Sequence, residues 1–261
     1  MTPTLPTAPT SLTNGGKSMT SADFKSIEWV WLDLDDTLWD FATNSVDSLG
    51  IIYYRHDLNR FYPTVDSWRE RYLHHNHELW ARYNVAEISR DYLQEQRFLR
   101  PLLEAGCPAS EAKALTAILH KDYLDVLGEH SLLIDGAAEL LDALHHKGFR
   151  IGILSNGFKE VQYRKLRSSG IDDKFDCVVL SDEIEVNKPD RRLFDHALAK
   201  AGTTAGKSLI IGDNPDTDIA GGAAAGWHTV YFNRDGKNSP APGCPLTVTS
   251  LREITAMLMR L

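Results

Sequence analysis

The sequence predicts an α/β fold, namely a doubly wound parallel sheet with helices on both faces and an inserted all-helical segment. Three observations support this prediction. Apolar runs alternate with helical patterns from Phe149 to the C-terminus, as in chains of β-α-β units. These runs end abruptly in polar or acidic residues, and ligands of such sheets bind beyond the strand ends. Segment 41–130 has helical periodicity, many aromatic residues and no convincing strand.

Five apolar runs are the predicted strands. Short runs rich in Val, Ile and Leu that end in polar turns are typical of strands buried on both faces of a parallel sheet. The runs cover residues 27–32, 150–154, 176–180, 208–211 and 228–232. The polar residues that follow them are therefore expected to lie along one edge of the sheet.

Helical patterns separate the later strands. Three segments have apolar residues at helical spacing and are each followed by a glycine: 137–147, 191–201 and 216–225. Glycine just after the last periodic residue is a common helix stop. The insert is expected to form several helices, broken at Pro101 and Pro108. Because the insert follows the first strand directly, we expect it to lie above the sheet edge at which the strands end in polar residues.

These patterns divide the chain into three parts. Residues 27–40 and 131–261 are predicted to form the core, and 41–130 a helical cap. Residues 1–26 are rich in Thr, Pro and Ser and lack the apolar segment of a secretory signal, so they are predicted to be a disordered leader. Met19 is a second candidate for the start of translation.

Composition restricts the partners of the protein. The 261 residues carry a formal net charge of −8, which gives no global attraction for nucleic acid or for an anionic membrane. No apolar run is long enough to span a bilayer. The three cysteines are far apart and form no CxxC pair, which argues against a disulfide framework and a structural zinc site. These features predict a cytoplasmic protein. The oligomeric state stays open between a monomer and a homodimer.

The strongest chemical signal is Asp33-Leu34-Asp35-Asp36-Thr37, at the end of the first predicted strand. Two carboxylates in one site raise each other's pKa, so this arrangement suits a site that also handles a cation and an anionic substrate. One carboxylate can attack phosphorus, and the other can protonate the leaving oxygen and then accept a proton from water. Thr37 can orient a carboxylate. The alternative is a turn and N-cap cluster before a helix.

Two further signals follow later strands. Ser155-Asn156-Gly157 offers a hydroxyl and turn amides that suit a phosphate oxygen, although many turns at strand ends have this composition. Lys188 precedes Pro189, which restricts Lys188 to an extended conformation and can itself open the next helix. A lysine fixed near acids stabilises the nucleophile and the transferring phosphoryl group. The alternative is a solvated surface lysine.

The last signal is the acidic segment 212–218, which follows an apolar run. Asp213 and Asp218 offer the oxygen ligands that a hard cation prefers. Asp216 and Asp218 also suit the first turn of a helix, where acids complement the helix dipole. We predict a metal role for Asp213 and a supporting role for Asp218.

In this order, and all at strand ends, the four signals resemble the motifs of the haloacid dehalogenase (HAD) superfamily of phosphatases. The resemblance implies a Rossmann-like core, a helical cap and Mg²⁺-dependent hydrolysis of a phosphomonoester through an aspartyl-phosphate. It implies that Asp33 is the nucleophile and a magnesium ligand. Asp35 is then the general acid and base, and its backbone carbonyl binds the metal. Ser155 and Lys188 hold the phosphoryl group, and Asp213 completes the magnesium site.

A finer resemblance points to the substrate. Segments 35–41, 155–158 and 212–222 resemble the pyrimidine 5′-nucleotidase (house-cleaning nucleotidase) branch, as do Leu79-Trp80 and Arg97-Phe98. This implies a nucleoside 5′-monophosphate as the small-molecule substrate. We add Thr37 and Asn156 to the predicted phosphate contacts. The candidates for stacking on a base are Trp39, Trp80 and Tyr83.

Other functions stay open at this stage. The ester could be a sugar phosphate or phosphoglycolate, and a mutase would transfer phosphate between sugar hydroxyls. A haloacid dehalogenase is a further alternative, but the acids at Asp35 and Asp213 count against it. A non-catalytic binding module would not need every motif position filled. The histidine cluster His74, His75 and His77 is interpreted as part of a solvated helix face rather than as a metal site. Segment 14–18 only faintly resembles a phosphate loop.

Overall fold

The computed structural model describes residues 25–236, 241 and 244–260. Most of the predicted disordered leader and the weak phosphate-loop resemblance therefore lie outside the described residues. The described chain contains a six-stranded sheet in the order β3-β2-β1-β4-β5-β6, and every neighbouring pair is parallel. The strands are β1 (Trp29–Leu32), β2 (Arg150–Ser155), β3 (Cys177–Leu180), β4 (Ser208–Gly212), β5 (His228–Phe232) and β6 (Thr247–Val248).

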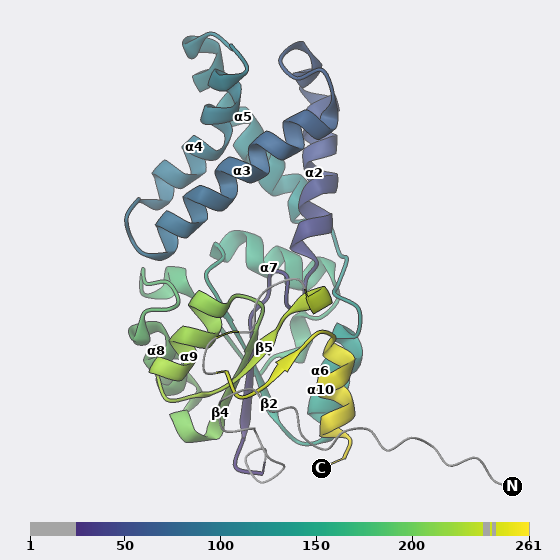
Figure 1. Cartoon of the computed structure of the whole chain (residues 1–261), viewed down its shortest axis with the longest axis vertical. Coiled ribbons are helices and arrows are strands. Elements are labelled where there is room, and N and C mark those ends of the chain that lie inside the picture. The colour runs from purple at the N-terminus through teal and green to yellow at the C-terminus, as the bar shows by residue number, and fades with distance from the viewer. Residues whose placement is uncertain (1–24, 237–240, 242–243, 261) are drawn as a thin grey trace, which may run out of the picture.

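The helices of the core cover both faces of this sheet (Figure 1). One face packs against α6 (Ala137–His146), α7 (Lys159–Ser168) and α10 (Leu251–Leu258). The other packs against α8 (Arg191–Ala201) and α9 (Ala220–Ala224), where a Cβ on Gly222 would lie 2.6 Å from the Ile210 side chain. Along β1, Val30 and Leu32 belong to the first apolar layer and Trp31 to the second, as the alternation of strand side chains requires. The predicted doubly wound parallel fold is confirmed.

Several predicted boundaries need correction. The helix expected over 216–225 is shorter, because a π-helical turn occupies Pro215–Ile219 and α9 begins only at Ala220. Pro189 does not open α8, whose N-cap is Asp190. The short strand β6 and the helices α7 and α10 were not among the predicted elements.

The helices of the insert stand above one end of the sheet (Figure 1). They are α2 (Phe41–Arg55), α3 (Val65–Asn84), α4 (Arg90–Glu104) and α5 (Ala109–Leu127). The break predicted at Pro101 is wrong, because α4 continues through this residue to Glu104. The break at Pro108 is right, since this residue is the N-cap of α5. That segment 41–130 forms a separate cap domain stays a prediction.

Aromatic packing holds these four helices together. The Tyr72 and Phe98 ring centroids are 4.8 Å apart, and both rings lie near Trp68 and Tyr123. All four side chains are buried, and they form one continuous apolar cluster with the first face of the sheet. Most aromatic residues of the insert are therefore core. Within the described part of the chain, we find no helix with the length and apolar character needed to cross a bilayer.

Candidate active site

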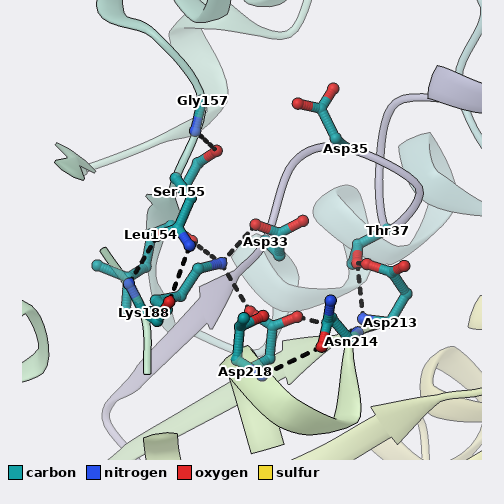
Figure 2. Close-up of polar contacts among 12 residues, drawn as sticks. Asp33, Asp35, Thr37, Leu154, Ser155, Gly157, Lys188, Asp213, Asn214 and Asp218 are labelled. Carbon is teal, nitrogen blue, oxygen red and sulfur yellow. Dashed lines mark hydrogen bonds and ion pairs between the residues drawn. The ribbon is translucent and has the colours of Figure 1, made fainter. Parts of the chain in front are cut away.

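Strand register brings the predicted site residues to one edge. Leu32, near the end of β1, pairs with Ile153 of β2 on one side and with Ile211 of β4 on the other. The chain therefore leaves all three strands at the same level, with Asp33, Ser155 and Asp213 at the exits. Figure 2 shows these residues around one point, with Lys188 reaching in from the side.

Lys188 connects the site residues through hydrogen bonds. Its Nζ donates to Asp33 Oδ1 at 2.5 Å, to Asp218 Oδ1 at 2.6 Å and to the Leu154 carbonyl at 2.7 Å. Its side chain is only 2% exposed, so the alternative of a solvated surface lysine is excluded. Burial lowers the pKa of Lys188, but the carboxylates of Asp218 and Asp33 outweigh burial and hold this pKa above its usual value. Lys188 is therefore a fixed cation.

Replacing Lys188 tests this assignment through stability. We expect Lys188→Met to lower the free energy of unfolding by about 3–5 kcal/mol at pH 8 without metal, because two buried carboxylates lose their counter-ion. Urea denaturation measures the change. Lys200→Met is the control, since Lys200 is half-exposed in its ion pair with Glu183 and such pairs contribute at most about 1 kcal/mol. Equal small losses in both variants would contradict the assignment.

Three carboxylates gather beside Lys188. Asp33, Asp213 and Asp218 each offer an oxygen, and these oxygens lie within 4.8 Å of one another. Burial, and then the neighbouring Asp218, raise the pKa of Asp33 to about 7 against the attraction of Lys188. Burial, followed by Asp33 and Asp218, holds the pKa of Asp213 well above its usual range. Burial and the neighbouring carboxylates thus both disfavour the ionised forms of Asp33 and Asp213.

The donor set fits a magnesium ion. Three carboxylates face one ammonium, so two negative charges remain uncompensated when all three acids are ionised. Mg²⁺ takes oxygen ligands and prefers carboxylates, and a divalent cation would offset this excess. The predicted magnesium ligands Asp33 and Asp213 lie in this cluster, whereas the Asp35 carboxylate is not part of it.

Hydrogen bonds position the acids that follow β4. Thr37 Oγ1 donates to Asp213 Oδ1 and accepts from the Asp213 backbone N–H, both at 3.1 Å. Asp218 Oδ2 accepts from the Asn214 N–H at 3.1 Å. Gly212 is required here, because a Cβ at this position would lie 2.3 Å from the Asp218 carboxyl carbon. Asp218 thus anchors Lys188 and the loop, in line with its predicted supporting role.

The fully buried Thr37 hydroxyl does not match the predicted phosphate contact. Its proton goes to Asp213, so it orients a carboxylate, which is the other role that the sequence predicts for Thr37. The side chain of Asn156 is also engaged within the protein, whereas a phosphate contact through its backbone amide stays a prediction. This side chain donates to Asn84 Oδ1 at 2.9 Å and to the Lys188 carbonyl at 3.0 Å, and it accepts from the Lys188 N–H at 2.7 Å. The Asn156 side chain is therefore occupied with holding the Lys188 loop and α3.

The Asp35 carboxylate points away from the other acids (Figure 2). It accepts from Lys165 Nζ at 2.5 Å and from Gln162 Nε2 at 3.0 Å. Gln162 also donates to Ser155 Oγ at 2.7 Å, and the Gly157 N–H donates to the same oxygen at 3.1 Å. Ser155 accepts both bonds and keeps its own proton for a ligand.

Lys165 and Gln162 were not predicted as site residues. Both belong to α7, and both are buried, with exposed fractions of 3% for Lys165 and 0% for Gln162. They lie three residues apart, on the side of α7 that faces Asp35. Their sequence signal is weak, because a Gln and a Lys on a polar helix usually face solvent.

A cavity of about 250 Å³ lies between the sheet edge and the insert. Asp33, Asp35 and Asp213 line it from the core, and Asn76, Trp80 and Arg97 line it from α3 and α4. Of the three predicted stacking residues, Trp80 therefore reaches the cavity. Trp39 does not line the cavity, since it is fully buried beneath Lys165, and Tyr83 lines a neighbouring groove.

The histidine group on α3 is embedded in ion pairs. His74, His75 and Glu78 offer ligand atoms within 4.8 Å of one another, and His77 is not in this group. Glu78 is already engaged by Arg100 at 3.1 Å and Arg82 at 4.0 Å. These cations disfavour a metal ion. His74 and His77 are exposed, as expected for a solvated helix face. The same prediction is wrong for His75, which is only 5% exposed and whose Nε2 lies 2.9 Å from Glu104 Oε1.

Comparison with known proteins is consistent with this geometry. The family model of haloacid dehalogenase-like hydrolases matches residues 27–226. The chain is 30% identical over 235 residues to the pyrimidine 5′-nucleotidase YjjG of Escherichia coli, covering 89% of this chain and 98% of that protein. It is 27% identical over 207 residues to the pyrimidine 5′-nucleotidase PynA of Streptococcus pneumoniae, covering 79% and 84%.

A solved structure gives the same result. The crystal structure of the HAD-hydrolase YfnB from Bacillus subtilis bound to magnesium superposes with a TM-score of 0.78 at 28% identity, covering 89% of this chain and 99% of that one. Family model, relatives and architecture agree. The chain therefore belongs to the haloacid dehalogenase-like hydrolases.

Proposed function

We propose that this phosphatase hydrolyses nucleoside 5′-monophosphates in two steps, through an aspartyl-phosphate, an acyl phosphate formed on Asp33. The observation that carries the proposal is the cluster of Asp33, Asp213 and Asp218 around Lys188 at the base of the cavity. Such a cluster is suited to an anionic group only when a cation accompanies it. The chemistry at the strand ends is that of phosphoryl transfer rather than of base or sugar recognition.

The first step uses Asp33 and Asp35. An Asp33 carboxylate oxygen attacks phosphorus in line with the ester oxygen, the new P–O bond forms, and the bond to the leaving oxygen breaks. Asp35 gives its proton to that oxygen, so the nucleoside leaves as an alcohol. Lys188 neutralises the phosphoryl oxygens, and the Ser155 hydroxyl donates to one of them.

The second step returns the enzyme to its starting state. A water molecule attacks phosphorus, and Asp35 accepts its proton. The bond between phosphorus and the Asp33 oxygen breaks, which releases inorganic phosphate and a free Asp33 carboxylate. Asp35 thus ends protonated and ready for the next cycle. In this structure Lys165 and Gln162 hold the carboxyl group of Asp35 on the cavity wall.

Magnesium belongs to the proposal as the missing cation. Asp33, Asp213 and the backbone carbonyl of Asp35 would hold it. When bound, the ion screens the negative charges of nucleophile and phosphate from each other. The names of the YjjG and PynA relatives support a nucleoside monophosphate as substrate, and Trp80 and Phe158 offer aromatic surface to a base.

Metal removal tests the proposal. We expect EDTA to abolish hydrolysis of phenyl phosphate and of nucleoside 5′-monophosphates, and excess Mg²⁺ to restore both. Phosphate release measures the activity. In a separate measurement, Mg²⁺ should raise the unfolding temperature of the wild type, because a ligand that binds the folded state stabilises it. Asp213→Asn should lose most of this rise, whereas the exposed neighbour Asp216→Asn should keep it.

Two results would reject the magnesium site. One is full activity of the dialysed protein in EDTA. The other is an equal thermal response to Mg²⁺ in Asp213→Asn and in Asp216→Asn. A substrate preference for sugar phosphates or phosphoglycolate over nucleotides would leave the chemistry intact and overturn the nucleotide assignment alone.

A further inference from the structure

Arg97 is a buried cation in the roof of the cavity. It lies on α4, its exposed fraction is 4%, and it lines the same cavity as Asp33. The other arginines nearby are tied to acids, since Arg100 and Arg82 pair with Glu78 and Arg90 pairs with Glu160 and Asp182. Among the described residues, no ion pair is formed by Arg97.

The hydrogen bonds of Arg97 are incomplete. Its Nη2 lies 3.1 Å from His120 Nδ1. Burial, and then the charge of Arg97, lower the pKa of His120 to about 4, so this imidazole is neutral and its Nδ1 accepts the bond. The buried Nε of Arg97 has no acceptor among the described residues. The guanidinium, which has five N–H donors, therefore keeps donor capacity unused.

The surroundings offset only part of the cost of burying this charge. The Arg97 guanidinium carbon lies 5.5 Å from the ring centroid of Tyr123 and 5.6 Å from that of Phe98, and such cation–π contacts stabilise a buried cation modestly. A buried cation without an acid is costly, and an aliphatic side chain would pack there without that cost. The arrangement makes sense if the acceptor arrives with a ligand.

A second polar group beside the cavity is also incompletely paired. Asn76 on α3 is 7% exposed and lines the cavity, and its Oδ1 has no donor within the described part of the chain. Arg97 offers donors alone, whereas the Asn76 amide offers a donor and an acceptor. The two come from the helical insert, and the phosphate site comes from the sheet edge. A ligand that reaches both must extend across the cavity.

We propose that Arg97 determines substrate specificity by binding oxygen acceptors on the leaving group of the phosphate ester. The acceptors are carbonyl oxygens, as on an oxo-substituted base, or carboxylate oxygens. Asn76 forms hydrogen bonds with a neighbouring polar group of the same ligand. This inference rests on the proposed function, because it assumes that the phosphate is held at Asp33 and the leaving group points toward the insert.

The test compares three esters that share the reacting phosphate. Phenyl phosphate has no acceptor on its leaving group, uridine 5′-monophosphate carries carbonyl oxygens, and O-phosphoserine carries a carboxylate. For each, kcat and KM are measured with Mg²⁺ for wild type, Arg97→Met and Arg100→Met. Arg100 lies on the same helix but pairs with Glu78 outside the cavity, so Arg100→Met is the matched control.

We expect Arg97→Met to lower kcat/KM for one acceptor-bearing ester by about 10- to 100-fold relative to phenyl phosphate, the size of a lost hydrogen bond to a charged group. The ester that loses most identifies the acceptor as carbonyl or carboxylate. Arg97→Lys, which keeps the charge but not the planar fork, should lose less. If Arg97→Met fails to fold, Arg97→Lys still carries the comparison.

Three outcomes overturn the inference, and they are distinguishable. One outcome is that wild type hydrolyses phenyl phosphate, but kcat/KM for the other two esters relative to phenyl phosphate is unchanged in Arg97→Met and Arg97→Lys. Arg97 then has no part in substrate selection, and the proposed function stands. The same holds if Arg100→Met changes these relative values equally. If wild type with Mg²⁺ hydrolyses none of the three esters, the proposed function itself fails, and this inference fails with it.

Discussion

Asp33→Asn should remove turnover almost completely while leaving the protein folded. An amide oxygen is a far weaker nucleophile than a carboxylate, and loss of a covalent nucleophile costs roughly 10⁴-fold or more in kcat. The amide has nearly the same shape as the carboxylate, so the packing around Lys188 is kept. Steady-state phosphate release from phenyl phosphate with Mg²⁺ measures the loss.

The stability of this variant separates chemistry from misfolding. Burial raises the pKa of Asp33 from 3.8 to about 7. A raised carboxyl pKa means that the wild type loses stability as pH rises from the unfolded to the folded value. Asparagine does not titrate, so without metal the variant should be at least as stable as wild type at pH 8, by urea denaturation. Residual activity within tenfold of wild type in a folded variant would rule out Asp33 as the nucleophile.

A covalent label gives an independent test of the same residue. Wild type quenched with acid during turnover of ³²P-labelled ester should retain label on the peptide that contains Asp33, and Asp33→Asn should retain none. Asp36→Asn is the matched control, because Asp36 lies in the same turn and its Oδ1 accepts from the Ala42 N–H. Label in Asp33→Asn would place the covalent step elsewhere.

The fold and the position of the site could be predicted from sequence because both depend on strand ends. In a parallel sheet the exits of β1, β2 and β4 lie at one edge, so acids after residue 32, a serine at 155 and acids after 212 must converge. The apolar runs mark those exits clearly. The predicted convergence of Asp33, Ser155 and Asp213 needed no knowledge of loops or side-chain rotamers.

The details that failed depend on side-chain direction, which strand periodicity does not determine. Asp35 was expected beside Asp33, but Lys165 and Gln162 draw its carboxylate to α7. Trp39 was a candidate for stacking on a base, and the structure buries it completely. The amphipathic α10 had a signal that could have found it, since Ser250 and Glu253 form a capping box and Leu251, Ile254 and Leu258 recur at helical spacing.

Asp35→Asn should slow both formation and hydrolysis of the phosphate on Asp33, but to different extents. We expect kcat to fall by about 10²–10⁴-fold, the usual contribution of a general acid and base. An ester with a good leaving group, such as p-nitrophenyl phosphate, needs little help from an acid. With this ester, formation of the Asp33 phosphate should therefore stay fast. Its hydrolysis should be slow, because the attacking water lacks its general base.

The consequence is a kinetic signature that a merely damaged site would not give. With p-nitrophenyl phosphate, Asp35→Asn should release a burst of nitrophenolate that approaches one equivalent of enzyme, followed by slow turnover, and the phosphorylated protein should accumulate in acid-quenched samples. With phenyl phosphate, a poorer leaving group, the burst should shrink because the first step also slows. Lys165→Met provides the comparison, since it removes the partner of Asp35 but keeps the carboxyl group, and it should show a smaller loss without a burst. Absence of a burst in Asp35→Asn, with label on Asp33 in wild type, would mean that another residue activates the water.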